Sequence, residues 1–247
     1  MPRIFSRHLI NSLRFPVVLL GVLWAIQLVQ MAFHLELGYW GVYPRTIYGL
    51  KGIITHPFLH GSIGHLLSNT PPLLFLTAMV LYFYRRVAIP AITLIYLFTG
   101  LAVWMFGRPV FHIGASGIIY GLVAFVFWTG VFRRNLKSIA LAAIVLFYYG
   151  SMFMGILPGE EGISWESHLL GAGSGILVSF WFKNRLESDE LPKVLCANSR
   201  TVFSPGTAIS FWPLCRGRSL KLAPGPGSIS PSTLPAPKCG LSNLLPA

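Results

Sequence analysis

Three groups of polar residues interrupt a sequence that is otherwise strongly apolar. Ser116 lies between glycines where a turn leads into an apolar segment, and His168 stands alone in a later apolar segment. His60, His65 and Asn69 precede both. A serine hydroxyl becomes a good nucleophile when a base removes its proton, and histidine is the usual base. We therefore expect Ser116 and His168 to meet in the fold as a catalytic pair.

An attacking serine also needs hydrogen-bond donors for the negative charge that develops on a substrate carbonyl. His65 and Asn69 are four residues apart, so they face the same way on a helix, and both side chains can donate. The backbone amide of Ser116, at the start of a helix, is a third candidate donor. His60 is expected to brace a loop rather than to take part in catalysis.

Two further residues bear on how His168 is held. Tyr120 follows Ser116 by four residues and shares its helical face. Its ring could pack against the imidazole and hold it, or it could be an ordinary buried aromatic residue. Glu166 precedes His168 by two residues, so on a helix it points to nearly the opposite side. The sequence therefore predicts a Ser–His dyad without an acidic third member.

Other proteolytic chemistries are excluded by residues that the sequence lacks. Aspartyl proteases of membranes need a pair of aspartates inside the membrane, but the only aspartate, Asp189, follows the last apolar segment. No His-Glu-x-x-His sequence is present to bind zinc. The spacing of Cys196, Cys215 and Cys239 matches no zinc pattern. We expect neither a metal nor another cofactor.

The composition indicates an integral membrane protein. Of the 247 residues, 54% are hydrophobic and only 11% are charged, which lies outside the usual range of soluble proteins. A membrane core of roughly 30 Å requires about 20 mostly apolar residues in a helix. Long apolar runs without alternation favour helices over a β-barrel. We predict an all-α membrane bundle of six transmembrane helices, at approximately residues 15–34, 63–84, 87–107, 115–132, 136–156 and 166–183.

Basic residues indicate the orientation of this bundle. They are concentrated before the first apolar segment and after the second, fourth and sixth, and such clusters stay on the cytoplasmic side. Both termini should therefore be cytoplasmic. The net charge of +12 then reflects topology and contact with anionic lipid headgroups, so no nucleic acid is needed to explain it.

Composition also divides the chain into three parts. Residues 1–14 form a cytoplasmic N-terminal segment, and residues 15–186 form the membrane domain. Residues 187–247 form a basic tail rich in proline, serine and glycine, which we expect to be disordered.

Glycines four residues apart occur in the fourth and sixth predicted helices. Small residues at this spacing let two helix backbones approach closely, although such pairs are also common as plain packing in helical membrane bundles. The two pairs are Gly117 with Gly121, and Gly171 with Gly175.

Together these residues resemble the rhomboid family of intramembrane serine proteases. The resemblance covers roughly residues 15–185 and rests on three motifs in order, His60-x4-His65-x3-Asn69, Gly114-x-Ser116-Gly117-x2-Tyr120 and His168-x2-Gly171-x3-Gly175. It implies a six-helix core in which Ser116 is the nucleophile and His168 the general base. It further implies that His65, Asn69 and the Ser116 amide stabilise the oxyanion while Tyr120 supports the histidine.

The same resemblance implies a substrate class. Rhomboids cleave other membrane proteins, typically single-span helices near the outer face, in a cavity that water enters from outside. Residues 155–164 would then form a mobile cap over this cavity, and the fifth helix would flank the path by which a substrate arrives from the lipid.

The sequence departs from the family in two places. The loop before the second predicted helix lacks the Trp-Arg pair of some bacterial members, which leaves Arg45 as an unproven substitute. Pro71 and Pro72 lie one turn after the oxyanion residues and predict a kink or a break, because they remove two amide donors.

Two other functions compete with proteolysis. A non-catalytic rhomboid-like protein would bind transmembrane clients, but inactive relatives usually lack one or both of the residues that correspond to Ser116 and His168. A small transporter or channel would carry charges along a pathway inside the membrane, and the predicted helices contain almost none. The expected location is a bacterial cytoplasmic membrane.

Overall fold

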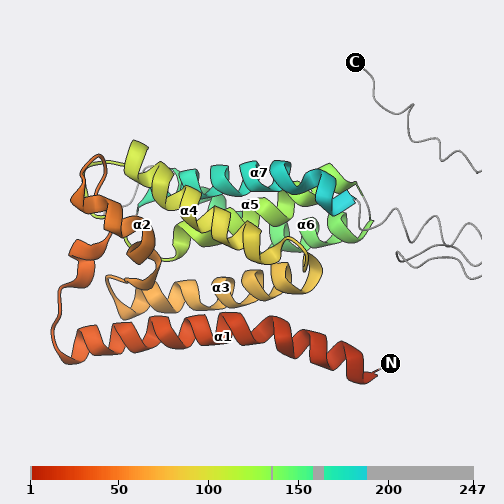
Figure 1. Ribbon diagram of the computed structural model, residues 1–247, viewed down its shortest axis with the longest axis horizontal. Coiled ribbons are helices and arrows are strands. Elements are labelled where there is room, and N and C mark those ends of the chain that lie inside the picture. Colours follow the sequence, from red (N-terminus) through yellow and green to blue (C-terminus); the bar gives the residue numbers. More distant parts are fainter. Residues whose placement is uncertain (1, 135, 158–163, 188–247) are drawn as a thin grey trace, which may run out of the picture. The chain divides into compact units, whose positions relative to one another are not determined.

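The computed structural model describes residues 2–134, 136–157 and 164–187 (Figure 1). Within these ranges the chain is helical and contains no β-strand. The predicted tail from residue 188 onward, including its three cysteines, lies outside the described residues, and so does most of the predicted cap, residues 158–163. The expectations about tail and cap therefore stay predictions.

The described elements follow one another along a simple path from α1 to α7. In order they are α1 Pro2–Ala32, the 3-10 helices η1 Leu37–Trp40 and η2 Tyr48–Lys51, α2 Gly52–Thr55, η3 His56–Phe58, α3 Ile63–Phe83, α4 Ala88–Phe106, α5 Ser116–Arg133, α6 Leu136–Tyr149, η4 Gly150–Ile156 and α7 Trp165–Glu187.

Among the described helices, four are long and apolar enough to cross a membrane, at Arg7–Ala32, Ile63–Phe83, Ala88–Phe106 and Ser116–Arg133. These match the first four predicted spans. The fifth differs from the prediction, because the α-helix ends at Tyr149 and the chain continues as a 3-10 helix. The sixth, α7, has 23 residues but carries more polar side chains. The fold is thus an all-helical bundle with four apolar candidate spans, and six crossings stay a prediction.

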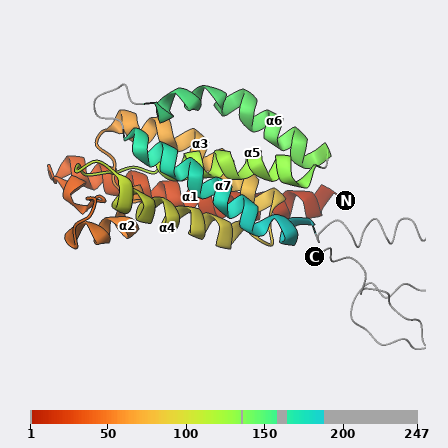
Figure 2. The ribbon, with the colours of Figure 1, turned by 90° about the horizontal axis from the view of Figure 1, so that it is seen from above.

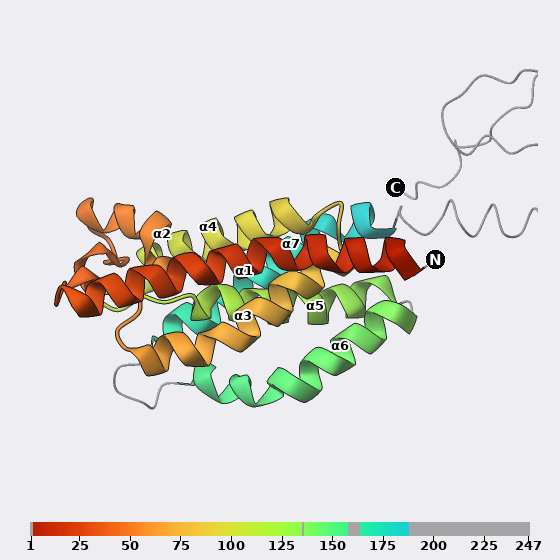
Figure 3. The ribbon, with the colours of Figure 1, turned by 90° about the horizontal axis from the view of Figure 1, so that it is seen from below.

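Helix α5 lies at the centre of the described bundle. It packs against α3, α4, α6 and α7, while α1 packs along α3. Figures 1 and 2 show α7 running beside α5 along its length. Figures 2 and 3 show α6 at the edge, close to α5 at one end and separated from it at the other. The side chains of Leu66, Leu76, Leu122 and Phe125 are completely buried among these helices.

Helix α3 continues through Pro71 and Pro72 as a single α-helix, so the chain does not break there, and the kink that was expected as the alternative stays a prediction. Because proline has no amide hydrogen, the carbonyls of Leu67 and Ser68 lose their helical donors, whereas the hydroxyls of this turn bond to carbonyls earlier in the helix. Ser68 Oγ donates to the His65 carbonyl at 2.9 Å, and Thr70 Oγ1 donates to the Leu66 carbonyl at 2.8 Å. Neighbouring helices and ordered water commonly satisfy such freed carbonyls, so proline is tolerated in membrane helices.

The long connection between α1 and α3 folds into short helices that meet the start of α5. Val42 and His112 exchange two backbone hydrogen bonds of 3.0 and 2.9 Å. Arg45 donates from Nη1 to the Gly107 carbonyl at 2.9 Å. Because Gly107 follows the last residue of α4, Arg45 satisfies a carbonyl at the C-terminus of that helix.

Candidate active site

The structure brings Ser116 and His168 together from two different helices. Ser116 is the first residue of α5, and His168 lies in the first turn of α7. Ser116 Oγ lies 2.9 Å from His168 Nε2, which is hydrogen-bond distance. Each residue is only 9% exposed. A serine and a histidine 52 positions apart in the sequence thus form a buried nucleophile–base geometry.

Glycines explain how α5 and α7 come this close. An added Cβ on Gly171 would lie 2.0 Å from the Gly117 carbonyl oxygen, and one on Gly175 would lie 2.0 Å from that of Gly121. Any larger residue would push the two helices apart. The predicted glycine pairs therefore face one another along a single seam, which we call the α5–α7 seam.

The proton positions on His168 follow from its second hydrogen bond. Nδ1 lies 2.7 Å from the Gly155 carbonyl oxygen. A carbonyl can only accept a hydrogen bond, so Nδ1 must carry the proton in neutral histidine. Nε2 then presents its lone pair to the Ser116 hydroxyl, as a general base requires. The Gly155 carbonyl thereby fixes the tautomer, a task that an aspartate performs in a catalytic triad.

Tyr120 packs on one face of the imidazole ring of His168. Its ring is stacked on that of His168, with centroids 4.1 Å apart and planes inclined by 7°. Its hydroxyl donates to the Met152 carbonyl at 2.8 Å. Tyr120 thus joins α5 to η4, the element that also supplies the Gly155 carbonyl.

His65 lies beside the turn that leads into Ser116, and Asn69 lies one helical turn further along α3. An added Cβ on Gly114 would lie 2.7 Å from His65 Cε1, so glycine is required for the ring to fit. Gly114 also has a φ of +105°, which other residues rarely adopt. Asn69 is 6% exposed, and within the described residues its Nδ2 donates to no protein acceptor. The amide of Asn69 and the imidazole of His65 are therefore available as donors on the same face of α3.

Two histidines support the turn before Ser116. The His56 carbonyl accepts the Gly114 amide at 2.8 Å, and His60 Nε2 accepts the Ala115 amide at 3.5 Å. Burial lowers the pKa of both His56 and His60 to about 4. Both rings are therefore neutral at pH 7, which leaves His60 Nε2 able to accept. This contact fits the expected bracing role of His60.

Comparison with known proteins identifies the family. The family model described as the rhomboid domain matches residues 48–185, which is more than half of the chain. The chain belongs to the rhomboid family. This rhomboid is 34% identical over 169 residues to an uncharacterized protein of Mycobacterium tuberculosis and to one of Mycobacterium bovis, a match that covers 65% of this chain and 70% of each relative. It is 29% identical over 148 residues to RHOMBOID-like protein 4 of Arabidopsis thaliana, covering 55% of this chain and 35% of that protein. Family membership and the apolar helices together make it an integral membrane protein.

A polar cluster anchors the start of α7 in this rhomboid. The Glu166 carboxylate is paired with the Arg108 guanidinium, whereas the two ring nitrogens of His168 contact Gly155 and Ser116. His112 Nδ1 lies 2.5 Å from Ser164 Oγ, which contacts Ser167 Oγ at 2.6 Å. Burial lowers the pKa of His112. The cluster ties the α4–α5 connection to α7 one turn from the dyad.

An apolar cavity of about 220 Å³ lies on the opposite side of Tyr120, between α5, α6 and α7. Its lining residues include Tyr120, Val145, Leu146, Tyr149, Met152 and Ile176. The helix α6 that forms its outer wall exposes large apolar side chains, among them Leu146 and Phe147. Within the described part of the chain, no three metal-binding side chains are grouped so that they could hold an ion.

Three supporting groups were not identified from the sequence. The Gly155 carbonyl is a backbone acceptor, and a backbone atom leaves no signature in residue type. His56 acts through its carbonyl as well, and its ring instead hydrogen-bonds to the Gly52 carbonyl at 2.9 Å. His112 offered a weak signal, because it lies four residues before Ser116 and a buried histidine needs partners.

Proposed function

We propose that this rhomboid is an intramembrane serine endopeptidase that cleaves transmembrane proteins through a Ser116–His168 dyad. The observation that carries the proposal is the hydrogen bond of 2.9 Å between Ser116 Oγ and His168 Nε2, with Nδ1 held by the Gly155 carbonyl. A serine hydroxyl beside an oriented imidazole, in a buried site, is the arrangement that activates serine for acyl transfer.

In the proposed reaction, His168 Nε2 removes the hydroxyl proton as Ser116 Oγ attacks the substrate carbonyl. The negative charge that develops on the carbonyl oxygen is stabilised by His65, Asn69 and the Ser116 amide. His168 then donates its proton to the leaving amine, which breaks the peptide bond and leaves an acyl-enzyme. Water activated by the same imidazole hydrolyses the ester and regenerates Ser116.

Tyr120 and Gly155 take the place of an acidic third residue in this scheme. When His168 becomes an imidazolium, the Gly155 carbonyl accepts a hydrogen bond from Nδ1–H and the Tyr120 ring faces the positive charge. Aromatic faces attract cations, and a charged donor makes a stronger hydrogen bond than a neutral one. Both contacts of the imidazole therefore become stronger as the reaction proceeds.

The membrane arrangement is also part of the proposal. Six helices cross the bilayer with both termini in the cytoplasm. Helix α7 supports a sixth crossing, because its 23 residues span about 35 Å and its buried Ser179 hydrogen-bonds to Thr129 of α5 at 2.9 Å. Single-span substrate helices reach the dyad past α6, where the apolar cavity adjoins Tyr120. The membrane is a bacterial cytoplasmic membrane, which the mycobacterial relatives favour.

Cleavage of single-span substrates by the protein reconstituted in liposomes tests this function. A panel of such substrates should yield defined fragments with the wild-type protein and none with Ser116→Ala. Fragments that persist undiminished in Ser116→Ala would exclude the serine mechanism. Tight binding of the substrates without cleavage by the wild type would instead support a non-catalytic client-binding function.

A further inference from the structure

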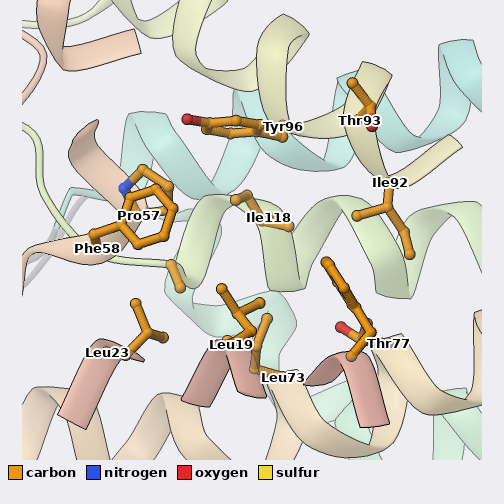
Figure 4. Close-up of a pocket in the computed structure, with 12 residues that line it drawn as sticks. Leu19, Leu23, Pro57, Phe58, Leu73, Thr77, Ile92, Thr93, Tyr96 and Ile118 are labelled. Atoms are coloured by element: carbon orange, nitrogen blue, oxygen red, sulfur yellow. The ribbon is translucent and has the colours of Figure 1, made fainter. Parts of the chain in front are cut away.

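A second apolar cavity lies on the side of α5 that faces α1, α3 and α4. Its volume is about 170 Å³. Figure 4 shows its walls, to which α1 contributes Leu19 and Leu23, α3 contributes Leu73 and Thr77, and α5 contributes Ile118. It is distinct from the cavity beside Tyr120, since the two share no lining residue.

One polar atom in this wall has no partner. Thr77 is 1% exposed, and its Oγ1 makes no hydrogen bond to any described residue. Threonine in a helix usually satisfies its hydroxyl on the carbonyl four residues earlier, as Thr70 does on Leu66. Figure 4 shows the Thr77 oxygen among the apolar side chains that line the cavity. A buried hydroxyl left in this state lowers stability unless a bound group completes its hydrogen bond.

The size and the opening of the cavity limit what that group can be. A closed apolar cavity of about 150 Å³ in another protein is known to bind benzene, so about 170 Å³ accommodates one six-membered ring with a small substituent. The most exposed lining residues are Phe15 and Thr93, at the side of α1 and α4. A ligand therefore arrives from the lipid between these two helices rather than from water.

We propose that this cavity binds a ring-sized lipophilic alcohol or phenol dissolved in the bilayer, with its hydroxyl hydrogen-bonded to Thr77 Oγ1. The ring packs against Leu73, Ile92 and Ile118, and the hydroxyl completes the hydrogen bonding of the buried Thr77 Oγ1. Ala115 also lines the cavity and immediately precedes Ser116, so the ligand contacts the turn that leads into the dyad. Binding itself does not depend on the proposed proteolysis.

Photocrosslinking of the full chain in lipid nanodiscs tests this proposal. The probe is a phenol bearing a diazirine, and its matched control is the same molecule without the hydroxyl. We expect adducts on the peptides that contain Leu73 to Thr77 and Ile92 to Tyr96, with p-cresol competing more strongly than toluene. The phenol should label on the order of fivefold more efficiently than its deoxy analogue, because it gains one buried hydrogen bond.

Two variants separate the hydroxyl from the cavity. Thr77→Val keeps the shape of the side chain and should reduce phenol labelling to the level of the deoxy analogue. Ile92→Phe fills the cavity and should abolish labelling by both probes. Equal labelling by the two probes in the wild type would overturn the hydrogen bond to Thr77. Adducts that survive Ile92→Phe, or that fall outside these peptides, would overturn the site.

Discussion

Two of the helices that pack against α5, namely α7 and α6, do so in opposite ways. Along the α5–α7 seam, Gly117 and Gly121 meet Gly171 and Gly175 so closely that no Cβ fits between the backbones. Helix α6 is equally close only at one end, where an added Cβ on Gly130 would lie 2.6 Å from the Ala142 Cβ. Toward its other end α6 diverges from α5, and a cavity of about 220 Å³ opens between them (Figures 2 and 3).

This difference separates two requirements of the proposed enzyme. The dyad needs its reacting atoms held to within a fraction of an ångström, and two backbones in direct contact cannot slide or tilt easily. A substrate helix needs space to approach, and a short helix held at one end can give it. Helix α5 thus has a fixed side, at the α5–α7 seam, which carries the chemistry. It also has a loose side, toward α6, which faces the lipid.

A methyl group in the α5–α7 seam should have the largest effect. Gly171→Ala places a Cβ about 2.0 Å from the Gly117 carbonyl, which forces the helices apart and moves His168 away from Ser116. We expect the rate of Ser116 labelling by a fluorophosphonate probe to fall about 100-fold. The free energy of unfolding should also fall, by about 1–3 kcal/mol.

Gly173→Ala is the matched control, because no atom lies within 4 Å of an added Cβ there. It should label like the wild type and gain up to about 1 kcal/mol in stability from its better helix propensity. Equal behaviour of Gly171→Ala and Gly173→Ala would show that the seam does not hold the dyad.

Tyr120 lies between the fixed and the loose side, so its variants sharpen the comparison. Tyr120→Leu removes the ring stacked on His168 and should slow labelling about tenfold, in line with the energy of an aromatic pair. Tyr120→Phe keeps the ring and loses only the hydrogen bond to the Met152 carbonyl, so we expect a decrease of about threefold. If the leucine variant labels as fast as the phenylalanine variant, the ring of Tyr120 does not support the histidine.

Much of the fixed side, which comprises the dyad and the α5–α7 seam, could be predicted from residue types and their spacing. Ser116, His168 and the glycine pairs could be found because each is an exception in an apolar helix, and a polar or very small residue there needs a reason. The Gly155 carbonyl could not be found, since every residue has one. The continuity of α3 through Pro71 and Pro72 could not be predicted either, because the position of the prolines does not determine whether a helix inside a bundle breaks or continues.

The loose side was harder to predict for a physical reason. Apolar composition shows that residues 136–156 avoid water, but it does not distinguish an α-helix from the 3-10 turns that begin at Gly150. Nor does it show where α6 leaves α5, because this depends on close contacts such as those of Gly130 with Ser138 and Ala142.

The ion pair between Glu166 and Arg108 should contribute less to the rate of labelling than the contacts of the imidazole with Gly155 and Tyr120. Glu166 is buried, with 6% of its side chain accessible, but Arg108 is half exposed at 52%, and solvent screening on that side keeps the contribution near about 1 kcal/mol. Glu166→Gln should therefore slow labelling about threefold. A double-mutant cycle with Arg108→Gln measures the coupling directly, and purely additive effects would show that the pair does not position α7.

Removing volume on the loose side should have the smallest effect on the dyad. Val145 is completely buried on α6 and lines the cavity beside Tyr120. Val145→Ala should cost about 1–2 kcal/mol of stability from lost apolar burial. Labelling by the small probe should change less than twofold, because the seam does not move. A decrease as large as that of Gly171→Ala would contradict the distinction between the two sides.

Mass spectrometry of the protein after reaction with the fluorophosphonate probe tests the central claim most directly. The wild type should carry one adduct on Ser116, and His168→Ala should lose it while Gly173→Ala retains it. A Ser116 adduct that forms at the wild-type rate in His168→Ala would contradict the dyad. A correctly folded wild type that never forms the adduct would contradict the proposed nucleophile.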